Sequence, residues 1–523
     1  MTQFLNFLGH MEGNKVFKQS KWPKTLIFEK STPGRTGYQV PELSSEEVKM
    51  LEKAKRTISS DLLRENSPNL PEVSELEVVR HFTRLSQMNY GVDSGFYPLG
   101  SCTMKYNPKI CDTVASMNEA QNVHPYQPED TIQGSLQIMY ELAKWLAELS
   151  GMAGVTLQPA AGAHGEYTGI MILRKYHESQ NNLAIKNEII VPDSAHGTNP
   201  ATVSMCGFKT IVIPSNNDGC VNIDALRSSV TNRTAGMMLT NPNTLGIFEP
   251  NIKEITDIIH GVDGLMYYDG ANFNAIMGKV RPGDMGFDIV HFNIHKTFAT
   301  PHGGGGPGAG PVGVVSHLIP FLPVPSVAYN STSDFYYFNY DHKQTIGKVR
   351  SYFGNFSILL RAYSYILRLG QTGLTRVSEM ANLNANYMKA QCARIHGFSV
   401  PYGENSSCMH EFVLSAKKLF KETEISALDI SKYLLDNGFH PPTVYFPLIV
   451  PEALMIEPTE TEPKEIIDDF IQVIRNISKL AYSGKKEGIQ NAPINTSVGR
   501  IDDVKAARDP IISYRMLKKQ KKD

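Results

Sequence analysis

The sequence predicts an α/β protein with a mostly parallel sheet covered by helices on both faces, followed by a smaller C-terminal α/β domain. The first observation is a series of short β-branched and apolar runs between residues 188 and 315. The second is that helical stretches, such as residues 222–230 and 251–259, lie between several of these runs. Apolar strands that alternate with helices are typical of parallel sheets buried on both faces.

Three regions follow one another along the 523-residue chain, which is too long for a single simple core. Residues 1–85 are polar and form an expected N-terminal arm that contains one helical stretch, EEVKMLEKAKRTIS. Residues 86–384 form the expected large domain, which begins with a long periodic helix over residues 131–150. The pattern of strands and helices changes after about residue 385, and residues 385–523 form the expected small C-terminal domain and tail.

The composition excludes several classes of protein. Lys and Arg number 51 against 52 Asp and Glu, so the chain lacks the basic surface expected for nucleic-acid binding. No apolar run approaches the roughly 20 residues of a membrane helix. The six cysteines contain no C-x-x-C pair, which argues against a structural zinc site and a secreted disulfide scaffold. We therefore expect a cytoplasmic protein that binds no nucleic acid, membrane or metal.

Polar side chains follow four of the predicted strands. The six strand runs cover residues 188–191, 209–213, 235–239, 264–268, 288–292 and 312–315. His196 follows the first run, Asn241 and Asn243 follow the third, Asp269 follows the fourth and Lys296 follows the fifth. Because ligands bind at the carboxyl ends of parallel strands, we expect these side chains to converge at one edge of the sheet.

Upstream of the runs, a turn of small residues leads into a predicted helix. The turn contains Ala161, Gly162 and Ala163. The first N–H groups of a helix have no partner within it, and they form a ready anion site.

Together these groups match the requirements of pyridoxal 5′-phosphate. This cofactor needs a lysine for covalent attachment and an acid against its pyridine nitrogen, which makes the ring an electron sink. It also needs a flat group over the ring, a donor to the ring oxygen and a phosphate cradle. The corresponding candidates are Lys296, Asp269, His196, either Asn241 or Asn243, and the turn of Ala161, Gly162 and Ala163.

Each candidate also has an ordinary structural explanation. Lys296 could be a surface lysine, Asp269 a turn residue and His196 a loop histidine, and the two asparagines flank a proline that favours a plain turn. The order of the set, with each member after its own strand, favours the cofactor site. The glycine run at 303–306 allows positive φ and close backbone approach, but could also be a hinge. No GK[ST] follows it, so it is not a P-loop.

Several longer stretches resemble the P-protein of the glycine cleavage system, in particular the C-terminal half that two-gene forms make as a separate subunit. The matching stretches span nearly the whole chain and include YPLGSCTMKYNPK, QPAAGAHGEYTGI, PDSAHGTNPA, TNPNTLGIFE, YYDGANFNAIMG, GFDIVHFNIHKTFATPHGGGGPGAGPVGV and MIEPTETE. The resemblance implies a fold-type-I pyridoxal phosphate enzyme with a seven-stranded sheet. It implies that Lys296 carries the cofactor, that Asp269 contacts the pyridine nitrogen and that His196 stacks on the ring.

The resemblance also implies substrate and partners. The substrate would be glycine, which loses CO2, and the remaining aminomethyl group would pass to the lipoyl disulfide of the H-protein. A second subunit similar to the N-terminal half, P-protein subunit 1, would complete an α2β2 assembly. An aminotransferase or glycine-type aldolase on the same fold, or a scaffolding subunit without cofactor, stays an alternative. The sequence leaves open the roles of five residues, which are Cys102, Lys105, His295, His302 and Arg361.

Overall fold

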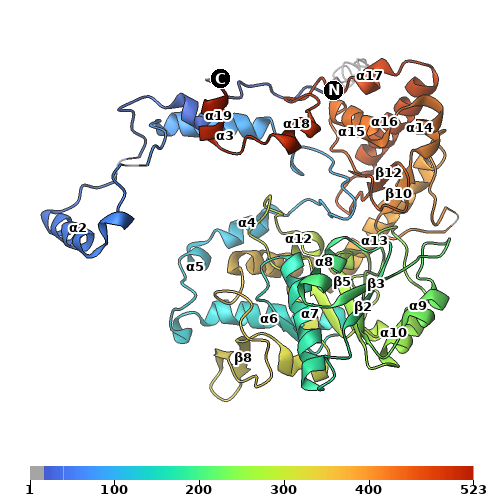
Figure 1. The fold of residues 1–523 in the computed structure, drawn as a ribbon, viewed down its shortest axis with the longest axis horizontal. Coiled ribbons are helices and arrows are strands. Elements are labelled where there is room, and N and C mark those ends of the chain that lie inside the picture. The colour runs from blue at the N-terminus through green and yellow to red at the C-terminus, as the bar shows by residue number, and fades with distance from the viewer. Residues whose placement is uncertain (1–16, 39, 67, 405, 522–523) are drawn as a thin grey trace, which may run out of the picture. The chain divides into compact units, whose positions relative to one another are not determined.

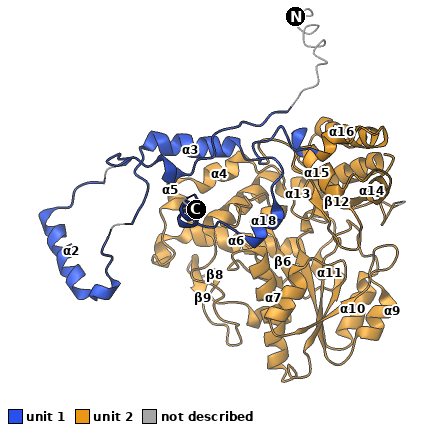
Figure 2. Ribbon diagram, turned by 45° about the horizontal axis from the view of Figure 1, so that its top comes forward, with its two compact units in different colours: residues 1–91, 435–438, 491–523 blue, residues 92–434, 439–490 orange. Residues whose placement is uncertain are grey.

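The computed structural model describes residues 17–38, 40–66, 68–404 and 406–521, which divide into two compact units (Figure 2). Unit 1 comprises residues 1–91, 435–438 and 491–523, and unit 2 comprises residues 92–434 and 439–490. The helices of unit 1 are α2 (Ser45–Thr57), α3 (Glu75–Gln87), α18 (Asp503–Arg508) and α19 (Tyr514–Gln520).

Capping explains where the two N-terminal helices of unit 1 begin. The Ser44 hydroxyl accepts the Glu47 N–H at the start of α2, and the Glu47 carboxylate accepts the Ser44 N–H in return. Ser74 and Glu77 repeat this arrangement at the start of α3. These are capping boxes, which satisfy N–H groups that the first helical turn leaves free. Helix α2 confirms the helix predicted in the N-terminal arm.

A seven-stranded sheet lies in unit 2, and Figure 1 labels three of its strands, β2, β3 and β5. The strand order is β1-β7-β6-β5-β4-β2-β3. Its strands are β1 (Gly154–Thr156), β2 (Glu188–Pro192), β3 (Lys209–Ile213), β4 (Thr234–Leu239), β5 (Leu265–Gly270), β6 (Ile289–Phe292) and β7 (Val312–Val314). Strands β2 to β6 are parallel to one another, and β7 runs antiparallel to both β6 and β1. All six predicted runs are strands, and the sheet confirms the predicted fold class. The sequence did not predict β1, since its three residues, GVT, include a glycine and only one strongly apolar side chain.

Successive side chains of the central strands belong to two different cores. In β5, Met266 and Tyr268 pack in one core, whereas Tyr267 between them packs in the other. This alternation follows from the two-residue period of a strand. Because both faces are buried, the sequences of these strands are continuous apolar runs and do not alternate between apolar and polar residues.

Helices cover the two faces. The first core is completed by α6 (Gln133–Ser150), α10 (Ile252–His260) and α13 (Phe356–Cys392), and the second by α7 (Gly162–Ser179) and α8 (Thr198–Met205). Gly151 ends α6 with a φ of 72°, a left-handed conformation that glycine adopts without steric cost. Helix α9 (Ile223–Ser229) joins β3 to β4.

A second, antiparallel sheet in unit 2 has the order β10-β12-β11 and its own core. Its strands are β10 (Phe412–Ser415), β11 (Thr443–Val444) and β12 (Ala453–Ile456), with helices α14 (Lys417–Thr423), α15 (Ala427–Asp436) and α16 (Lys464–Tyr482). Helix α13 contributes its C-terminal part to this core, as Ala385 and Met388 show. The shorter elements are α4 (Lys109–Ala115), α5 (Asn118–Gln121), α11 (Pro282–Met285), α12 (Ile294–Thr297), α17 (Glu487–Gln490) and the hairpin of β8 (Ser326–Asn330) and β9 (Phe335–Asn339).

The division into units differs from the three predicted regions. Residues 491–523, the last part of the predicted small domain and tail, group with the N-terminal segment. The predicted boundaries at 85 and 384 stay predictions. Among the residues that the structure describes, no helix is both long and apolar enough to cross a membrane.

Candidate active site

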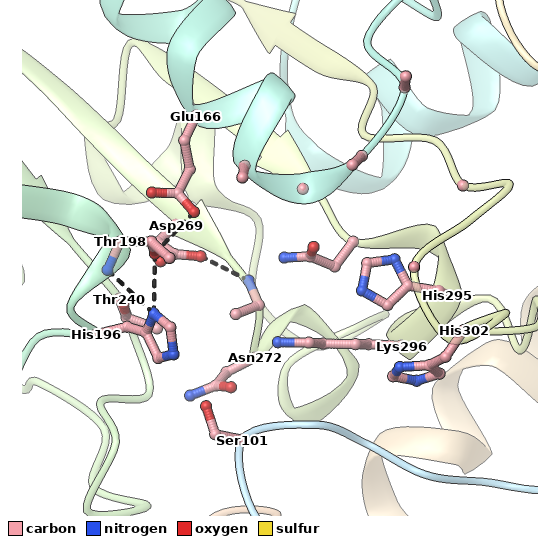
Figure 3. Close-up of a pocket in the computed structure, with 18 of the residues that line it drawn as sticks. Ser101, Glu166, His196, Thr198, Thr240, Asp269, Asn272, His295, Lys296 and His302 are labelled. Atoms are coloured by element: carbon pink, nitrogen blue, oxygen red, sulfur yellow. Dashed lines mark hydrogen bonds between the residues drawn. The ribbon is translucent and has the colours of Figure 1, made fainter. Parts of the chain in front are cut away.

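A cavity of about 370 Å³ lies at the carboxyl ends of the parallel strands in unit 2 (Figure 3). It brings together Lys296, Asp269 and His196, as the sequence predicts. The turn of Ala161, Gly162 and Ala163 also lines it. Each group comes from a different strand-to-helix connection, so the parallel sheet is what gathers them.

Asp269 is the next-to-last residue of β5, and only 2% of it is exposed. Its Oδ2 accepts a hydrogen bond from Asn199 Nδ2 at 3.0 Å, and its Oδ1 accepts one from the Ala271 N–H at 3.0 Å. His291 Nε2 lies 3.5 Å from Oδ1. Burial alone raises the pKa of Asp269, but His291, the Asn199 amide and the charge of Lys296 outweigh it and hold the pKa below its usual value. Asp269 is therefore ionised at neutral pH.

Glu166 on α7 is a second buried carboxyl group beside Asp269. Its Oε2 accepts a hydrogen bond from Asn199 Nδ2 at 3.1 Å, and its Oε1 accepts one from Thr198 Oγ1 at 3.0 Å. The Asn199 amide thus donates to both carboxyl groups. Burial, and then the charge of Asp269, raise the pKa of Glu166 to about 7. At pH 7 Glu166 is therefore only about half ionised, whereas Asp269 is ionised, although the two acids share a donor.

His291 on β6 is fully buried and fixes the far side of Asp269. Its Nδ1 lies 2.7 Å from the Tyr267 hydroxyl, and its Nε2 lies 2.9 Å from Asn293 Nδ2. Both ring nitrogens therefore have partners, and the ring is held in one orientation beside Asp269. Asn293 also lines the cavity.

Lys296 lies on the single-turn helix α12, directly after β6. Its side chain begins near His295 and His302 and points toward His196 (Figure 3). Burial and the charge of Lys296 lower the pKa of His295 to about 3 and that of His302 to about 4, so both rings are neutral at pH 7. Lys296 is thus the one cationic side chain among the residues described as lining the cavity.

The N-terminus of α7 supplies the expected anion cradle. Ala161 occupies the N-cap position and makes no side-chain hydrogen bond, so no side chain caps the N–H groups of the first turn. A Cβ on Gly162 would overlap Oδ1 of Asn293. The close approach of α7 to the cavity therefore requires glycine at this position. An 18-residue helix with exposed N–H groups at the cavity suits a phosphate group.

The glycine run at 303–306 closes another side of the cavity, through Gly305 and Gly306. All four glycines have positive φ, between 61° and 130°. A Cβ on Gly304, Gly305 or Gly306 would meet nothing within 4 Å. Within this chain, backbone conformation rather than crowding therefore explains these three glycines.

His196 lies between β2 and α8, with its ring open to the cavity. Its Nδ1 accepts the Thr198 N–H at 3.2 Å and lies 2.9 Å from the Thr198 hydroxyl. Partial burial lowers the pKa of His196, which keeps the ring neutral at pH 7. A flat neutral ring fixed at one nitrogen suits the predicted contact with an aromatic cofactor.

Asn241 and Asn243 do not line the cavity, so the expectation that one of them faces the cofactor does not fit the structure. The Asn241 side-chain oxygen accepts the Glu249 N–H at 2.9 Å, and the Asn243 amide donates to the Gly219 carbonyl at 2.8 Å. Both side chains are buried and fix the turn after β4. The cavity residues from this segment are Thr240 and Thr244.

A cluster of buried acids lies behind the cavity wall. His410 Nε2 is 3.7 Å from Glu411 Oε1 and 3.9 Å from Glu457 Oε1. Glu411 accepts the N–H of Ser101, which lines the cavity. Burial raises the pKa of Glu411 well above its usual value and that of Glu457 to about 7, so at pH 7 we expect Glu411 to be protonated and Glu457 to be about half protonated. Among the residues that the structure describes, these three side chains form the group whose ligand atoms lie close enough to share a metal ion. The expected absence of a metal stays a prediction.

Three of the five residues left open by the sequence, Cys102, Lys105 and Arg361, lie outside the cavity lining. Arg361 on α13 pairs with Asp112 at 2.7 Å and donates to the Ser357 carbonyl, so it does not face Lys296. Burial raises the pKa of the Cys102 thiol, which keeps it protonated and unreactive.

Sequence reasoning missed Glu166, Asn199, His291, Asn272 and Ser101. Some signals were present: Glu166 lies one helical turn after Gly162, and Asn272 lies three residues after Asp269. His291 gave no signal, because it lies inside an apolar strand.

The whole arrangement fits pyridoxal phosphate. A lysine, an ionised acid, a flat ring and a helix N-terminus face one cavity, which is the set that the cofactor needs.

Comparison with known proteins agrees with this fit. Residues 39–326 match the family described as glycine cleavage system P-protein, and residues 377–495 match the C-terminal domain of glycine dehydrogenase. A protein of Pyrococcus furiosus named probable glycine dehydrogenase (decarboxylating) subunit 2 is 56% identical over 506 residues, which cover 97% of this chain and 99% of that protein. A protein of the same name from Caldanaerobacter subterraneus subsp. tengcongensis is 55% identical over 490 residues, covering 94% and 98% of the two chains.

Solved structures show the same fold. A glycine decarboxylase (P-protein) in inhibitor-bound form has a TM-score of 0.68 at 18% identity, over 84% of this chain and all of that one. A NifS-like protein has a TM-score of 0.57 at 15% identity, over 74% of this chain and all of that one. These likenesses confirm the fold-type-I expectation. The family model matches more than half of the chain, and relatives are identical to it at more than half of the aligned positions. The chain therefore belongs to the P-protein family of the glycine cleavage system, which decarboxylates glycine with pyridoxal phosphate.

Proposed function

We propose that this cavity holds pyridoxal phosphate for the decarboxylation of glycine, with Lys296 as the covalent attachment point. The observation that carries the proposal is the buried, ionised Asp269 at one sheet edge with Lys296 in the same cavity. When bound, the cofactor supplies an electron sink for the bond that breaks.

The chain's own residues then have defined tasks. Asp269 would keep a proton on the pyridine nitrogen, because a carboxylate with a lowered pKa stabilises a positive charge beside it. His196 would contact the ring, and the N–H groups of Ala161, Gly162 and Ala163 would bind the phosphate. Lys296 would hold the cofactor covalently through its Nζ.

The cavity also suits loss of a carboxylate. No arginine is among the residues described as lining it, and the nearby imidazoles of His295 and His302 are neutral. A bidentate arginine would stabilise the substrate carboxylate before it leaves. Without such an arginine the substrate carboxylate is not stabilised in this way, which favours release of CO2.

The proposal extends to the acceptor and partners. Loss of CO2 leaves two electrons on the glycine carbon, which form a new carbon–sulfur bond as the lipoyl disulfide of H-protein breaks. The second sulfur leaves as a thiolate and takes one proton. The relatives' names include "subunit 2", which supports a partner subunit 1 in an α2β2 assembly. We place the protein in the cytoplasm, and its six free cysteines support this location.

Borohydride reduction followed by peptide mapping tests the attachment point. We expect the reduced cofactor on the peptide that contains Lys296, and none in Lys296→Ala. Lys279→Ala is the matched control, since Lys279 is an exposed lysine paired with Glu379. Covalent cofactor retained in Lys296→Ala would contradict the assignment.

A second experiment tests the reaction. With lipoylated H-protein and a subunit 1 homologue present, we expect glycine-dependent exchange of labelled bicarbonate into the glycine carboxyl group. Transamination or aldol cleavage without exchange would instead support a different pyridoxal phosphate enzyme on this fold.

A further inference from the structure

Lys105 is a buried lysine that the proposed reaction does not use. Its side chain is 1% exposed, and the residue is not part of the cavity lining. Its Nζ donates to the Thr297 carbonyl at 2.8 Å, to Glu460 Oε1 at 2.8 Å and to the Tyr365 hydroxyl at 3.1 Å. All three donors of the ammonium group therefore have an acceptor.

The contact with Thr297 connects Lys105 to the proposed attachment point. Thr297 is the residue after Lys296 and the last residue of α12. This helix has four residues, and its N-cap residue makes no side-chain capping bond. One helical turn is unstable by itself, and its last carbonyls lack partners within the helix. An ammonium group at that end satisfies a carbonyl and also interacts well with the helix dipole.

The charge of Lys105 persists in spite of burial. Burial alone would lower its pKa, but Glu460 and Tyr365 outweigh this effect and raise the pKa above its usual value. The ammonium group is therefore a permanent link between the carbonyl of Thr297 and the carboxylate of Glu460. Removing it would leave Glu460 buried without its cation, which is costly.

Lys105 also belongs to a segment that binds the small domain at alternate positions. The Ser101 N–H donates to Glu411 Oε2 at 2.8 Å, and the Thr103 hydroxyl donates to Glu457 Oε1 at 2.6 Å. Lys105 continues this series with Glu460. Glu411 directly precedes β10, and Glu457 and Glu460 follow β12. The segment of residues 101–105 therefore links α12 to the small domain.

We propose that Lys105 is a positioning residue for Lys296. Its ammonium group binds the Thr297 carbonyl at the end of α12 and also binds Glu460 of the small domain. It thereby fixes the position of α12 relative to Glu460. The inference rests on the proposed attachment of the cofactor to Lys296, and it assigns to Lys105 no contact with cofactor or substrate.

The test compares Lys105→Met, Glu460→Gln and the double variant with the unmodified chain in the full assembly. Methionine keeps the apolar stem but removes the charge and donors. Lys109→Met is the matched control, because Lys109 lies four residues further along the chain, at the start of α4, and its side chain is 56% exposed. The readouts are the fraction of cofactor trapped by borohydride at Lys296, the pH midpoint of the absorbance change of the linkage, and kcat and KM for glycine.

We expect Lys105→Met to lower the trapped fraction and kcat about tenfold or more, with a smaller change in KM, because a small misplacement of a reacting group is costly. The absorbance midpoint should shift, and Lys109→Met should change none of these quantities. The double variant should lose less than the sum of the single losses, since both changes break one link. If Lys105→Met does not fold, Glu460→Gln tests the same link with the same readouts.

An unchanged trapped fraction and midpoint in folded Lys105→Met would overturn the inference, even if its melting temperature fell. So would additive losses in the double variant. If the unmodified chain itself traps no cofactor at Lys296, the proposed function fails first. A normal result for the unmodified chain and for Lys105→Met removes only the positioning role.

Discussion

Replacement of Glu166 with Gln should remove a pH-dependent loss of stability from the cofactor-free chain. Burial and Asp269 raise the pKa of Glu166 from 4.5 to about 7 in the folded protein. The folded state thus holds this proton more tightly than the unfolded chain. Stability therefore falls as the pH rises from 4.5 to 7 and levels off above 7. Such a shift corresponds to about 3.4 kcal/mol at high pH.

About 2.5 kcal/mol of this difference should appear between pH 5 and pH 8.5. Glutamine keeps the side-chain volume and an acceptor oxygen but cannot ionise. The unfolding free energy of the unmodified chain should thus fall by about 2.5 kcal/mol more than that of Glu166→Gln over this range. All other titrating groups are common to both proteins, so their contributions cancel in the comparison.

Tryptophan fluorescence during urea unfolding can measure this difference. The chain has two tryptophans, Trp22 and Trp145. A Trp22→Phe background leaves Trp145, which lies on α6 and stacks on Tyr363, as the reporter of the large domain. Glu178→Gln is the control, because Glu178 lies on the same helix as Glu166 but is 58% exposed. Parallel pH dependences of the unmodified chain and Glu166→Gln would refute the reasoning.

Three further variants test other parts of the site. Asp269→Asn should lower kcat by about 100-fold or more, because it removes the charge that keeps the ring protonated; steady-state kinetics measure this, and an unchanged kcat would contradict the role. Gly162→Ala should weaken cofactor binding about tenfold, since its Cβ would overlap Asn293 Oδ1 and displace the N-terminus of α7; titration of the cofactor-free chain would detect it, and normal affinity would argue against the cradle. Arg361→Met should cost about 1 kcal/mol or less and leave the glycine KM unchanged, because it breaks only the partly exposed pair with Asp112; a raised KM would place Arg361 at the substrate.

The fold was predictable because its strands and helices leave strong local patterns. A buried parallel strand such as β4 is a continuous apolar run, and a helix such as α6 shows its period over 18 residues and ends at glycine. The three-residue strand β1 lacks both signals. Its place in the sheet comes from pairing with β7, which is a contact between residues about 160 positions apart.

The site was predictable only in part, for a related reason. Lys296, Asp269 and His196 follow strands, so the topology alone directs them to one edge. The same rule wrongly included Asn241 and Asn243. Position after a strand does not tell whether an amide turns into the cavity or back to its own loop, and hydrogen bonds to Gly219 and Glu249 decide this here.

The contrast between Glu166 and Asp269 shows how the environment assigns charge within the site. Both carboxyl groups are buried and accept a hydrogen bond from Asn199 Nδ2, so neither burial nor this donor can distinguish them. Asp269 has in addition His291 at 3.5 Å and the Ala271 N–H, whereas Glu166 has neutral hydroxyl donors. These extra partners favour the charge on Asp269, and that charge in turn disfavours a second one on Glu166.

The consequence below about pH 7 is a single negative charge at the position where the cofactor's pyridine nitrogen would need it. Two ionised carboxylates at this edge would bind a proton between them and compete for it with the ring. A protonated Glu166 still accepts the hydrogen bonds of Thr198 and Asn199 and holds Asn199 in place. The pH at which Glu166 ionises, about 7, therefore sets an upper limit to the range in which Asp269 is the sole charge.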